Sequence, residues 1–327
     1  MQRSSSTLIP TGHNAFLAPG PVIVRQPAAS ARGLTTTVPR EYVHRAAVSE
    51  VLLTNWKTDK SDCFLVNAQW PRGHALFAPT ADHQDPLLLV ESVRQVGALL
   101  AHTEYDVPFG HQFLMWNMSF SALPEALSVG PTPTEVELRT TCHDIVRRGK
   151  QLMSMAYHVS VERDGLPLAV AEARFSCTSP AVYRRLRGER PTTTALALPV
   201  GIAPKSVGRP GSRDVVLAAT GAGTPLRWQL RVDTSHPIFF DHPVDHVPGM
   251  VLIESARQAA YAATGLTDAL PVQLDSTFTR YAELDAPCWI EAEPGRPDAA
   301  GIIPVRITGT QRDETVFTAT VGLRPLV

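Results

Sequence analysis

The chain has 327 residues, of which 44% are hydrophobic and 19% are charged, and its formal net charge at pH 7 is −1. This composition is typical of a globular protein and argues against wholesale disorder, and the length is sufficient for two domains. Because the net charge is close to zero, no general attraction to nucleic acid or to an anionic membrane is expected, and we predict neither as a partner.

The chain shows no recognisable signal for export, membrane insertion or cofactor binding. The first twenty residues contain no sustained apolar run, and no run is long enough for a membrane-spanning helix. There is no phosphate-binding glycine loop and no metal-ligand spacing, so we expect no cofactor and no metal. Scattered cysteines are typical of reduced thiols, and we expect a soluble, cytoplasmic protein. The cysteines are Cys63, Cys142, Cys177 and Cys288.

Two segments rich in Pro, Gly, Thr or Ser divide the chain. Residues 1–40 show no hydrophobic periodicity, which predicts a flexible N-terminal extension. Residues 187–212 have the same character and are predicted to form a linker. We therefore expect one domain at 41–186 and a second domain at 213–327.

The first predicted domain contains one helix among strands. A strand is expected at 63–70, followed by a helix at 87–100. This helix is apolar almost all round, which is typical of a buried central helix rather than a surface helix. Strand-like alternation and β-branched or aromatic residues then recur in four segments. These segments are 111–120, 135–146, 151–165 and 167–178.

The second predicted domain has the same layout. A strand is expected at 227–234 and an apolar helix at 250–263. Only strand-like segments follow this helix, as in the first domain. They are 272–284, 288–295, 302–314 and 315–326.

The two predicted helices align with each other without gaps. The sequence LLLVESVRQVGALL (87–100) matches MVLIESARQAAYAA (250–263) at a shift of 163 positions. So many matches at one shift indicate an internal duplication. The matched pairs are Glu91 and Glu254, Ser92 and Ser255, Arg94 and Arg257, Gln95 and Gln258, His83 and His246, and Phe77 and Phe240. With a shorter loop, Asn117–Phe120 also resembles Asp275–Phe278.

About five antiparallel strands around one buried helix form the hotdog arrangement. This is an α+β architecture in which a sheet covers a central helix. We therefore predict a tandem double hotdog, with two antiparallel sheets that are each wrapped around a buried helix.

The repeated motif places charged groups on each apolar helix. Positions i, i+3 and i+4 share one face, so Glu91, Arg94 and Gln95 project together. Glu254, Arg257 and Gln258 do the same in the second copy. Unpaired buried charges cost several kcal/mol. Either each motif is a paired structural unit that fixes how the helix docks, or the Glu is a catalytic group and the Arg and Gln bind substrate.

Histidines precede both motifs. His83 and His246 each lie eight residues before their Glu, in the loop that enters the helix. Histidine is suited to acid–base chemistry near neutral pH, so both are candidate catalytic residues. His236 and His242 compete for this role, and a loop histidine bonded only to backbone remains an alternative.

The two helix starts differ. Pro248 and Gly249 precede the second helix, where glycine would let a carbonyl oxygen approach free N–H groups. Gly249 is therefore a candidate substrate-binding residue. The first helix instead begins after Asp85 and Pro86, which is ordinary helix-start chemistry. The two sites are not expected to be equivalent.

These segments resemble two groups of hotdog enzymes. The segment 236–260, HPIFFDHPVDHVPGMVLIESARQAA, resembles the helix entrance of hotdog dehydratases of fatty-acid synthesis. Three segments resemble the A-factor biosynthesis hotdog family of actinomycetes, and that resemblance covers about 43–327. The three segments are VHRAAVSEVLLTNW (43–56), LLLVESVRQVG (87–97) and PGMVLIESARQAA (248–260).

The second resemblance implies an acyltransferase. Such enzymes join a β-ketoacyl chain, carried on acyl carrier protein, to the hydroxyl of dihydroxyacetone phosphate. The product is the precursor of a γ-butyrolactone, butenolide or furan signal. By position, the resemblance implies Glu91, Glu254 and Arg257 as functional residues. On the chemistry above, a Glu would be the base and Arg257, with Arg94, would bind the phosphate, because arginine donates paired hydrogen bonds.

Two alternatives stay open at this level. One is a hotdog dehydratase or thioesterase that acts on acyl thioesters. The other is a non-catalytic protein that binds an acyl group or a lactone. The basic cluster Arg184, Arg185, Arg187 and Arg190 would suit an acidic carrier protein, although such a run is more often the solvated end of a strand.

Overall fold

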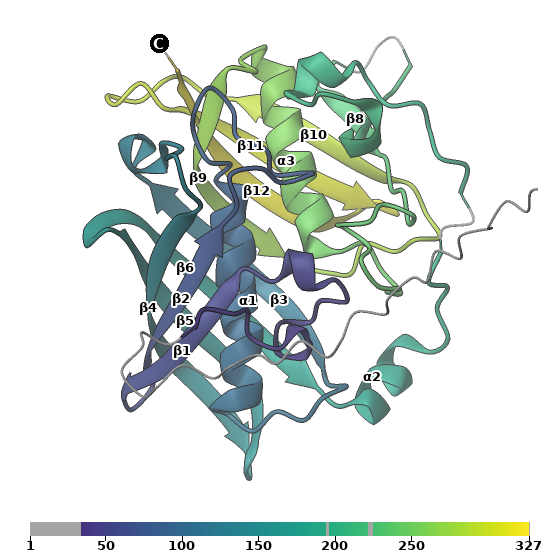
Figure 1. The fold of residues 1–327 in the computed structure, drawn as a ribbon. Coiled ribbons are helices and arrows are strands. Elements are labelled where there is room, and N and C mark those ends of the chain that lie inside the picture. Colours follow the sequence, from purple (N-terminus) through teal and green to yellow (C-terminus); the bar gives the residue numbers. More distant parts are fainter. Residues whose placement is uncertain (1–33, 194–195, 222–224, 327) are drawn as a thin grey trace, which may run out of the picture. The chain divides into compact units, whose positions relative to one another are not determined.

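A computed structural model describes residues 34–193, 196–221 and 225–326, and Thr35–Val327 form one unit. This unit contains one twelve-stranded antiparallel sheet and two long helices (Figure 1). Most of the predicted N-terminal extension, residues 1–33, lies outside the described residues.

The first half contributes six strands and the helix α1. The helix is Leu87–Thr103, and the short helix α2 (Pro180–Arg187) follows the last strand. Short 3₁₀ helices are Arg40–Val43, Val48–Glu50 and Pro124–Leu127. The strands are β1 (Leu53–Lys60), β2 (Cys63–Trp70), β3 (Gln112–Ala122), β4 (Thr134–Arg148), β5 (Gln151–Arg163) and β6 (Leu166–Thr178).

The second half repeats this arrangement around the helix α3, Gly249–Thr264. Two 3₁₀ helices, Pro204–Val207 and Ser212–Asp214, precede it. The strands are β7 (Leu217–Ala219), β8 (Arg227–Leu230), β9 (Ala269–Phe278), β10 (Cys288–Pro294), β11 (Ile303–Gln311) and β12 (Glu314–Pro325).

The order of strands shows the duplication directly. It is β1-β2-β4-β5-β6-β3-β9-β12-β11-β10-β8-β7, so each strand of one half has a counterpart at the mirrored place in the other. At the centre, β3 pairs with β9, and Met118 lies opposite Ser276. These two residues occupy equivalent places in the two copies, which locates a pseudo-two-fold axis between them.

The prediction of a tandem double hotdog is confirmed, with two differences. The two expected sheets are joined into one continuous sheet, because β3 and β9 present open edges that bond to each other. Each half also has six strands rather than about five, since β1 and β7 were not predicted.

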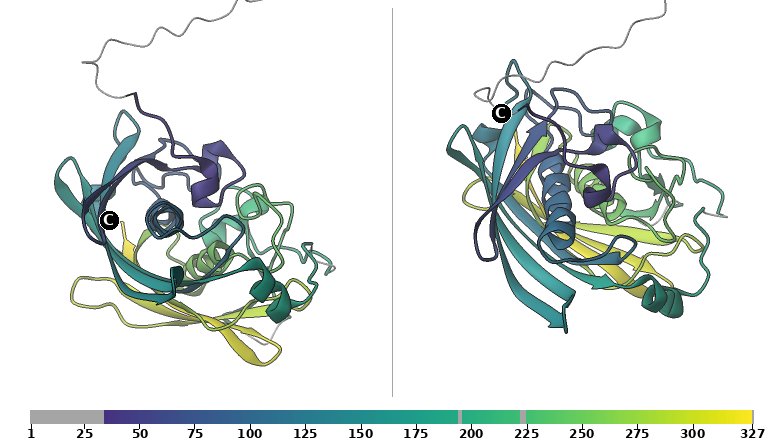
Figure 2. Two further views of the ribbon diagram at one scale, coloured as in Figure 1. Left: turned by 90° about the horizontal axis from the view of Figure 1, so that it is seen from below. Right: turned by 60° about the horizontal axis from the view of Figure 1, so that its bottom comes forward.

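Both long helices are buried, as their all-round apolar sequence predicts. In Figure 2, α1 is seen end-on within the curve of the strands. Leu88, Val93 and Leu99 of α1 are fully buried, as are Ala256 and Ala259 of α3. This all-round burial lets two charged motifs be held deep inside the molecule.

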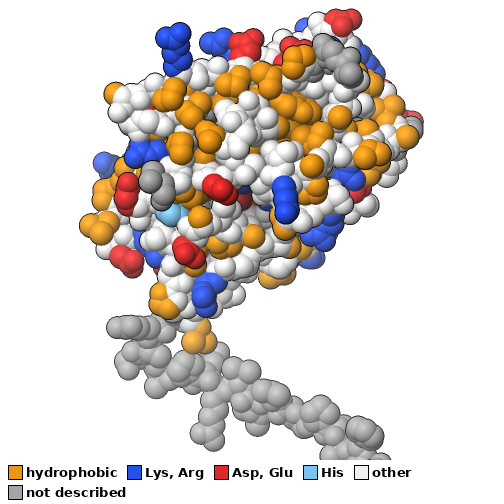
Figure 3. Space-filling view, turned by 90° about the horizontal axis from the view of Figure 1, so that it is seen from above, with side chains coloured by type: hydrophobic (Ala, Val, Ile, Leu, Met, Phe, Trp, Pro, Cys, Tyr) orange, Lys and Arg blue, Asp and Glu red, His pale blue; other side chains and the backbone are white. Residues whose placement is uncertain are grey.

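The exposed surface mixes charges of both signs with hydrophobic side chains on the face seen in Figure 3. Among the described residues, none of the helices has the length and apolar character needed to cross a membrane.

Close packing of α1 against β5 depends on Gly97. A Cβ atom at this position would lie 2.5 Å from the Tyr157 hydroxyl, which donates a hydrogen bond to the Val93 carbonyl (2.8 Å). We expect Gly97→Ala to lower the free energy of unfolding by about 1–3 kcal/mol, as overpacking does. Denaturant unfolding would measure this loss. Gly73→Ala is the matched control, because a Cβ there would meet nothing within 4 Å. Equal stability of the two variants would contradict this account of the packing.

Candidate functional site

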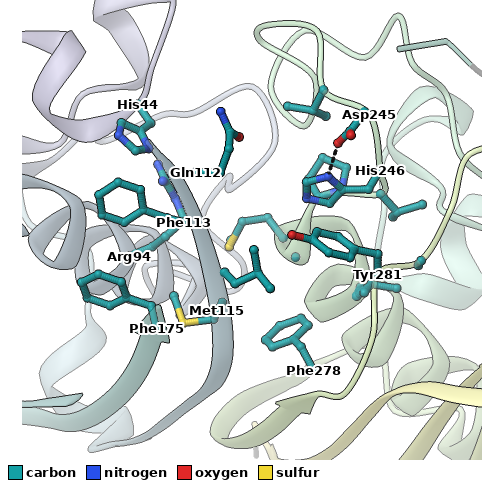
Figure 4. A pocket seen from close by; sticks show the side chains of 18 of the residues that line it. His44, Arg94, Gln112, Phe113, Met115, Phe175, Asp245, His246, Phe278 and Tyr281 are labelled. Atoms are coloured by element: carbon teal, nitrogen blue, oxygen red, sulfur yellow. Dashed lines mark hydrogen bonds and ion pairs between the residues drawn. The ribbon is translucent and has the colours of Figure 1, made fainter. Parts of the chain in front are cut away.

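A cavity of about 1300 Å³ lies between the two halves. One wall is formed by α1 and β3, and the opposite wall by the loop that enters α3 and by the segment after β9. Figure 4 shows His44, Arg94 and Gln112 on the first wall and Asp245, His246 and Tyr281 on the second. Its apolar lining includes Phe113, Met115, Met118, Phe175, Leu252 and Phe278.

The first copy of the motif lies behind this cavity. Glu91 is almost completely buried and is held by two arginines, Arg45 (2.7 Å) and Arg94 (2.7 Å). The amide of Gln95 also donates to Glu91 (2.7 Å). Although burial opposes the shift, Arg45 and Arg94 lower the pKa of Glu91 to about 2. Glu91 is therefore ionised at neutral pH and anchors two cations, and it does not line the cavity.

Arg94 connects this buried pair to the cavity. Its Nε and Nη2 atoms bond to Glu91, and Nη2 also donates to the Val43 carbonyl (3.2 Å). No partner within the described chain is assigned to Nη1, and the side chain, 23% exposed, lines the cavity. One edge of a pre-oriented guanidinium is thus available to an anion.

The side chains of the second copy of the motif bond to one another and do not reach the cavity. Glu254 has no exposed surface and is held by Arg209 and Arg257, each at 2.5 Å, and by Gln258. Arg257 also bonds to Asp85 (2.6 Å). Burial raises the pKa of Glu254 to about 7, with Asp85 adding to the shift and Arg209 opposing it. None of these five side chains lines the cavity.

The arginines Arg45 and Arg209 were missed by sequence reasoning. They lie 46 and 45 positions before their Glu partners, and each crosses to the other half of the molecule. Arg45 donates to the Ile238 carbonyl (3.3 Å), and Arg209 donates to the Leu76 carbonyl (2.5 Å). Their similar distance from the motifs was a usable signal, but Arg209 falls in the predicted linker 187–212.

The two glutamines of the motif organise backbone rather than the cavity. Gln95 accepts from Leu52 N (3.0 Å) and donates to the Glu50 carbonyl (2.7 Å). Gln258 makes the same two contacts with Val216 N and the Asp214 carbonyl. Both glutamines were expected to bind substrate. In the structure each one bonds to backbone groups in the same way, and neither lines the cavity.

The two helix starts differ in the way that matters for a ligand. At α1, the Asp85 carboxylate accepts from Leu87 N (2.9 Å) and also binds Arg257, so this end is occupied. At α3, no acceptor within the described residues is assigned to the N–H groups of Gly249 and Met250, and both residues line the cavity. The positive end of the α3 dipole is therefore open to a ligand.

Only one of the two duplicated histidines reaches the cavity. His83 bonds through Nδ1 to the Ala81 carbonyl (2.6 Å) and lies outside the lining. His246 lines the cavity, and its Nδ1 bonds to Asp245 (2.7 Å). Tyr183 of α2 donates to the same carboxylate (2.6 Å). Asp245 therefore orients the His246 ring and leaves its Nε2 for a ligand.

The competing histidines also differ. His236 is buried, accepts from backbone N–H groups and faces Asp214 (3.2 Å), so it has a structural place. His242 lines the cavity rim and bonds to Asp241 (2.5 Å). Within the described residues, no group of three His, Cys, Asp or Glu side chains is placed to hold a metal ion.

Three of the four arginines of the basic cluster, Arg184, Arg185 and Arg187, belong to α2 rather than to the end of a strand, and Arg190 follows this helix. Arg184 and Arg185 are exposed on this helix, and Arg184 lines the cavity mouth. Arg187 is buried, pairs with Glu283 (2.5 Å) and lies over the Tyr281 ring at 3.9 Å. This anchor holds α2 beside the mouth with its other arginines facing solvent.

The fold defines the class of protein, a double hotdog, and a largely apolar cavity lies between its two halves. The chain belongs to the family of the A-factor biosynthesis hotdog domain, whose model matches residues 27–179 and 192–326. This confirms the family resemblance that the motifs indicated.

Two relatives support this membership, and a solved structure supports the fold. The 2-oxo-3-(phosphooxy)propyl 3-oxoalkanoate synthase of Streptomyces virginiae is 53% identical over 89% of this chain and 99% of that protein. The synthase of the same name from Streptomyces coelicolor is 40% identical over 93% of this chain and 98% of its own. A candidate oleoyl thioesterase from Lactobacillus plantarum is similar in fold alone, with a TM-score of 0.51 and 12% identity over 80% of this chain and 95% of that one.

Proposed function

We propose that this protein is an acyltransferase that forms a 2-oxo-3-(phosphooxy)propyl 3-oxoalkanoate, the precursor of a γ-butyrolactone, butenolide or furan signal. The donor is a β-ketoacyl thioester of acyl carrier protein, and the acceptor is dihydroxyacetone phosphate. The observation that carries the proposal is one cavity with an apolar wall, an open helix N-terminus and a free arginine edge, in a chain 53% identical to a synthase of that name. Such a donor is made in the cytoplasm, where we expect the protein to act.

The donor is held by apolar contacts and by α3. The acyl chain lies against Phe113, Met115 and Phe175, where burial of each methylene contributes about 0.8 kcal/mol. The thioester carbonyl faces the N–H groups of Gly249 and Met250. These dipoles stabilise the oxyanion that develops when the carbonyl is attacked.

The acceptor is held by Arg94. Its free Nη1 edge donates to the phosphate, while Glu91, which also binds Arg45, keeps the guanidinium in place. Arg257, which the family resemblance implies as a functional residue, is already engaged by Glu254 and Asp85. In our mechanism Glu91 therefore positions the phosphate-binding arginine. Arg257 and Glu254 have a structural role in the second copy of the motif.

The reaction exchanges a C–S bond for a C–O bond. The acceptor hydroxyl loses its proton as its oxygen attacks the thioester carbon, and the carrier thiol departs with a proton. We assign the second proton to His246, since Asp245 bonds to its Nδ1 and orients the ring with Nε2 toward the ligand. The hydrogen bond from His246 and the charge of Arg187 help to keep the pKa of Asp245 low, against the effect of burial.

The exposed arginines of α2 offer a surface for an acidic carrier protein. Arg184→Glu with Arg185→Glu is expected to slow transfer from the carrier-bound thioester about tenfold or more, because like charges repel the partner. Transfer from a small thioester of N-acetylcysteamine should be unchanged. Steady-state rates with both donors measure this. Arg148→Glu, another exposed arginine, is the matched control, and equal loss with both donors would argue against a docking role.

Incubation with a β-ketoacyl thioester, with and without dihydroxyacetone phosphate, tests the function itself. Mass spectrometry should detect the phosphorylated ester only when the acceptor is present. Free acid or an enoyl thioester that forms at the same rate without the acceptor would overturn the proposal in favour of a thioesterase or dehydratase. No consumption of the thioester would indicate a binding protein.

A further inference from the structure

A chain of hydrogen bonds in the first half ends at the cavity. His102 of α1 bonds through Nδ1 to the Val107 carbonyl (2.6 Å), and its Nε2 lies 2.7 Å from Nε2 of His44. The Phe113 ring packs edge-on against His44, with ring centroids 4.6 Å apart. These contacts fix both the position and the plane of the His44 ring.

This chain determines which ring nitrogens carry hydrogen. A carbonyl can only accept, so Nδ1 of His102 must be protonated. Burial lowers the pKa of both imidazoles, that of His44 to about 3, so both rings are neutral at pH 7. Nε2 of His102 is then an acceptor, and Nε2 of His44 must be the donor. Consequently Nδ1 of His44 carries a free lone pair.

The free nitrogen belongs to a cavity residue beside the proposed phosphate site. His44 lines the cavity, and Figure 4 shows it next to Arg94. No donor within the described residues is assigned to its Nδ1. The charged or titratable groups that act on it are Arg94, His102 and His242.

The proposed acceptor substrate has one group that can donate a hydrogen bond to this lone pair. Dihydroxyacetone phosphate carries a phosphate, a ketone and a hydroxyl, and only the hydroxyl can donate a hydrogen bond when the phosphate is fully ionised. If Arg94 holds dihydroxyacetone phosphate by its phosphate, the hydroxyl group lies in the same cavity as His44.

We propose that His44 is the catalytic base that takes the proton of the acceptor hydroxyl. This inference rests on the proposed function. As the hydroxyl oxygen forms its bond to the thioester carbon, its proton moves to Nδ1 of His44, and the C–S bond breaks with the sulfur protonated by His246. His44 then returns its proton to solvent, and His246 regains one.

The acceptor itself would activate this base. In the empty cavity, the charge of Arg94 adds to burial in keeping the pKa of His44 low. A phosphate dianion on Arg94 offsets that charge and attracts the imidazolium, so His44 becomes a stronger base when the acceptor is bound. The same coupling would limit hydrolysis of the thioester while the acceptor is absent.

Two substitutions test the role without straining the backbone. His44 has a φ of +53°, a left-handed conformation that asparagine and glycine adopt readily. His44→Asn keeps an acceptor but cannot act as a base near pH 7. We expect its kcat to fall about 10²-fold or more, with little change in the KM for dihydroxyacetone phosphate. His44→Gly should lose as much, and added imidazole should restore part of its kcat but not raise that of the native enzyme.

Thermal unfolding of both variants verifies that they fold. A His44→Asn enzyme with native kcat, or a His44→Gly enzyme that loses kcat and does not respond to imidazole, would overturn the assignment while the native enzyme still makes the ester. If the native enzyme makes no ester at all, the proposed function is wrong and not only the role of His44.

Discussion

Glu91→Gln is expected to lower the free energy of unfolding by about 3–5 kcal/mol, the cost of breaking a buried ion pair on one side. The substitution leaves Arg45 and Arg94 without their shared carboxylate inside the molecule. It should also reduce acyl transfer, because Arg94 loses the anchor that aims it at the cavity. Denaturant unfolding and steady-state rates measure the two effects.

The same carboxylate sets a pH dependence. The pKa of Glu91 in the folded protein is lowered to about 2 from an ordinary 4.5. A depressed carboxyl pKa stabilises the fold fully above the unfolded value and ceases to do so as the pH falls through the folded value. Stability of the native protein should therefore decline between about pH 4.5 and 2, and that part of the decline should be missing in Glu91→Gln.

Glu254→Gln is the matched control for this substitution. Glu254 has the same kinds of neighbours, two arginines and a glutamine, but burial raises its pKa to about 7. Glu254→Gln still leaves the buried Arg209 without its carboxylate, so we expect a comparable loss of stability. We expect a smaller loss of activity, because these side chains do not line the cavity. If Glu254→Gln lost more activity than Glu91→Gln at equal folded fraction, the active site would have to be moved to the second motif.

Arg94→Met is expected to raise the KM for dihydroxyacetone phosphate about 30- to 150-fold. This corresponds to the loss of about 2–3 kcal/mol of charge-assisted hydrogen bonding to the phosphate. Glu91 keeps Arg45 and Gln95 as partners, so the fold should survive. The KM for the acyl thioester should change little, because the donor is held by the apolar wall and α3.

Arg148→Met is the control for this experiment, since Arg148 is exposed at the end of β4 and does not line the cavity. Titration with inorganic phosphate adds a direct measure of binding. Unchanged KM for the acceptor in Arg94→Met would contradict the phosphate assignment, whereas an equal rise with Arg148→Met would indicate a general effect of charge.

Local sequence patterns were sufficient for much of the fold. Burial on every face of 87–100 and 250–263 follows from their apolar composition, and the strands follow from alternation. The strands β1 and β7 were not predicted, because β1 is mostly polar and β7 is only three residues long. The pairing of β3 with β9 was not predicted either, since the pairing of edge strands depends on how the two folded halves pack together.

The candidate site was predicted less completely. The paired arginine and glutamate on one helix face were readable from i, i+3 spacing. Their second arginines were not, because Arg45 and Arg209 lie 46 and 45 positions before their Glu partners and meet them only once the chain has folded. His44 lies in the segment 43–56 that resembles the family, but it was not singled out there, and its proposed role depends on a ring of α1 that is 58 positions away.

The sequence by itself determined the duplication, the double hotdog, the family and the presence of a Glu-Arg-Gln face on each buried helix. These properties are local or repeated, so they appear as periodicity and as identity at one shift. The difference between the two helix starts was also readable, from Asp85-Pro86 in one copy and Pro248-Gly249 in the other. Only the tertiary structure decided that Arg94 faces a cavity while Arg257 is closed by Asp85. Two nearly identical motifs acquire different chemistry because burial and partners from the other half set the charge, exposure and pKa of each side chain.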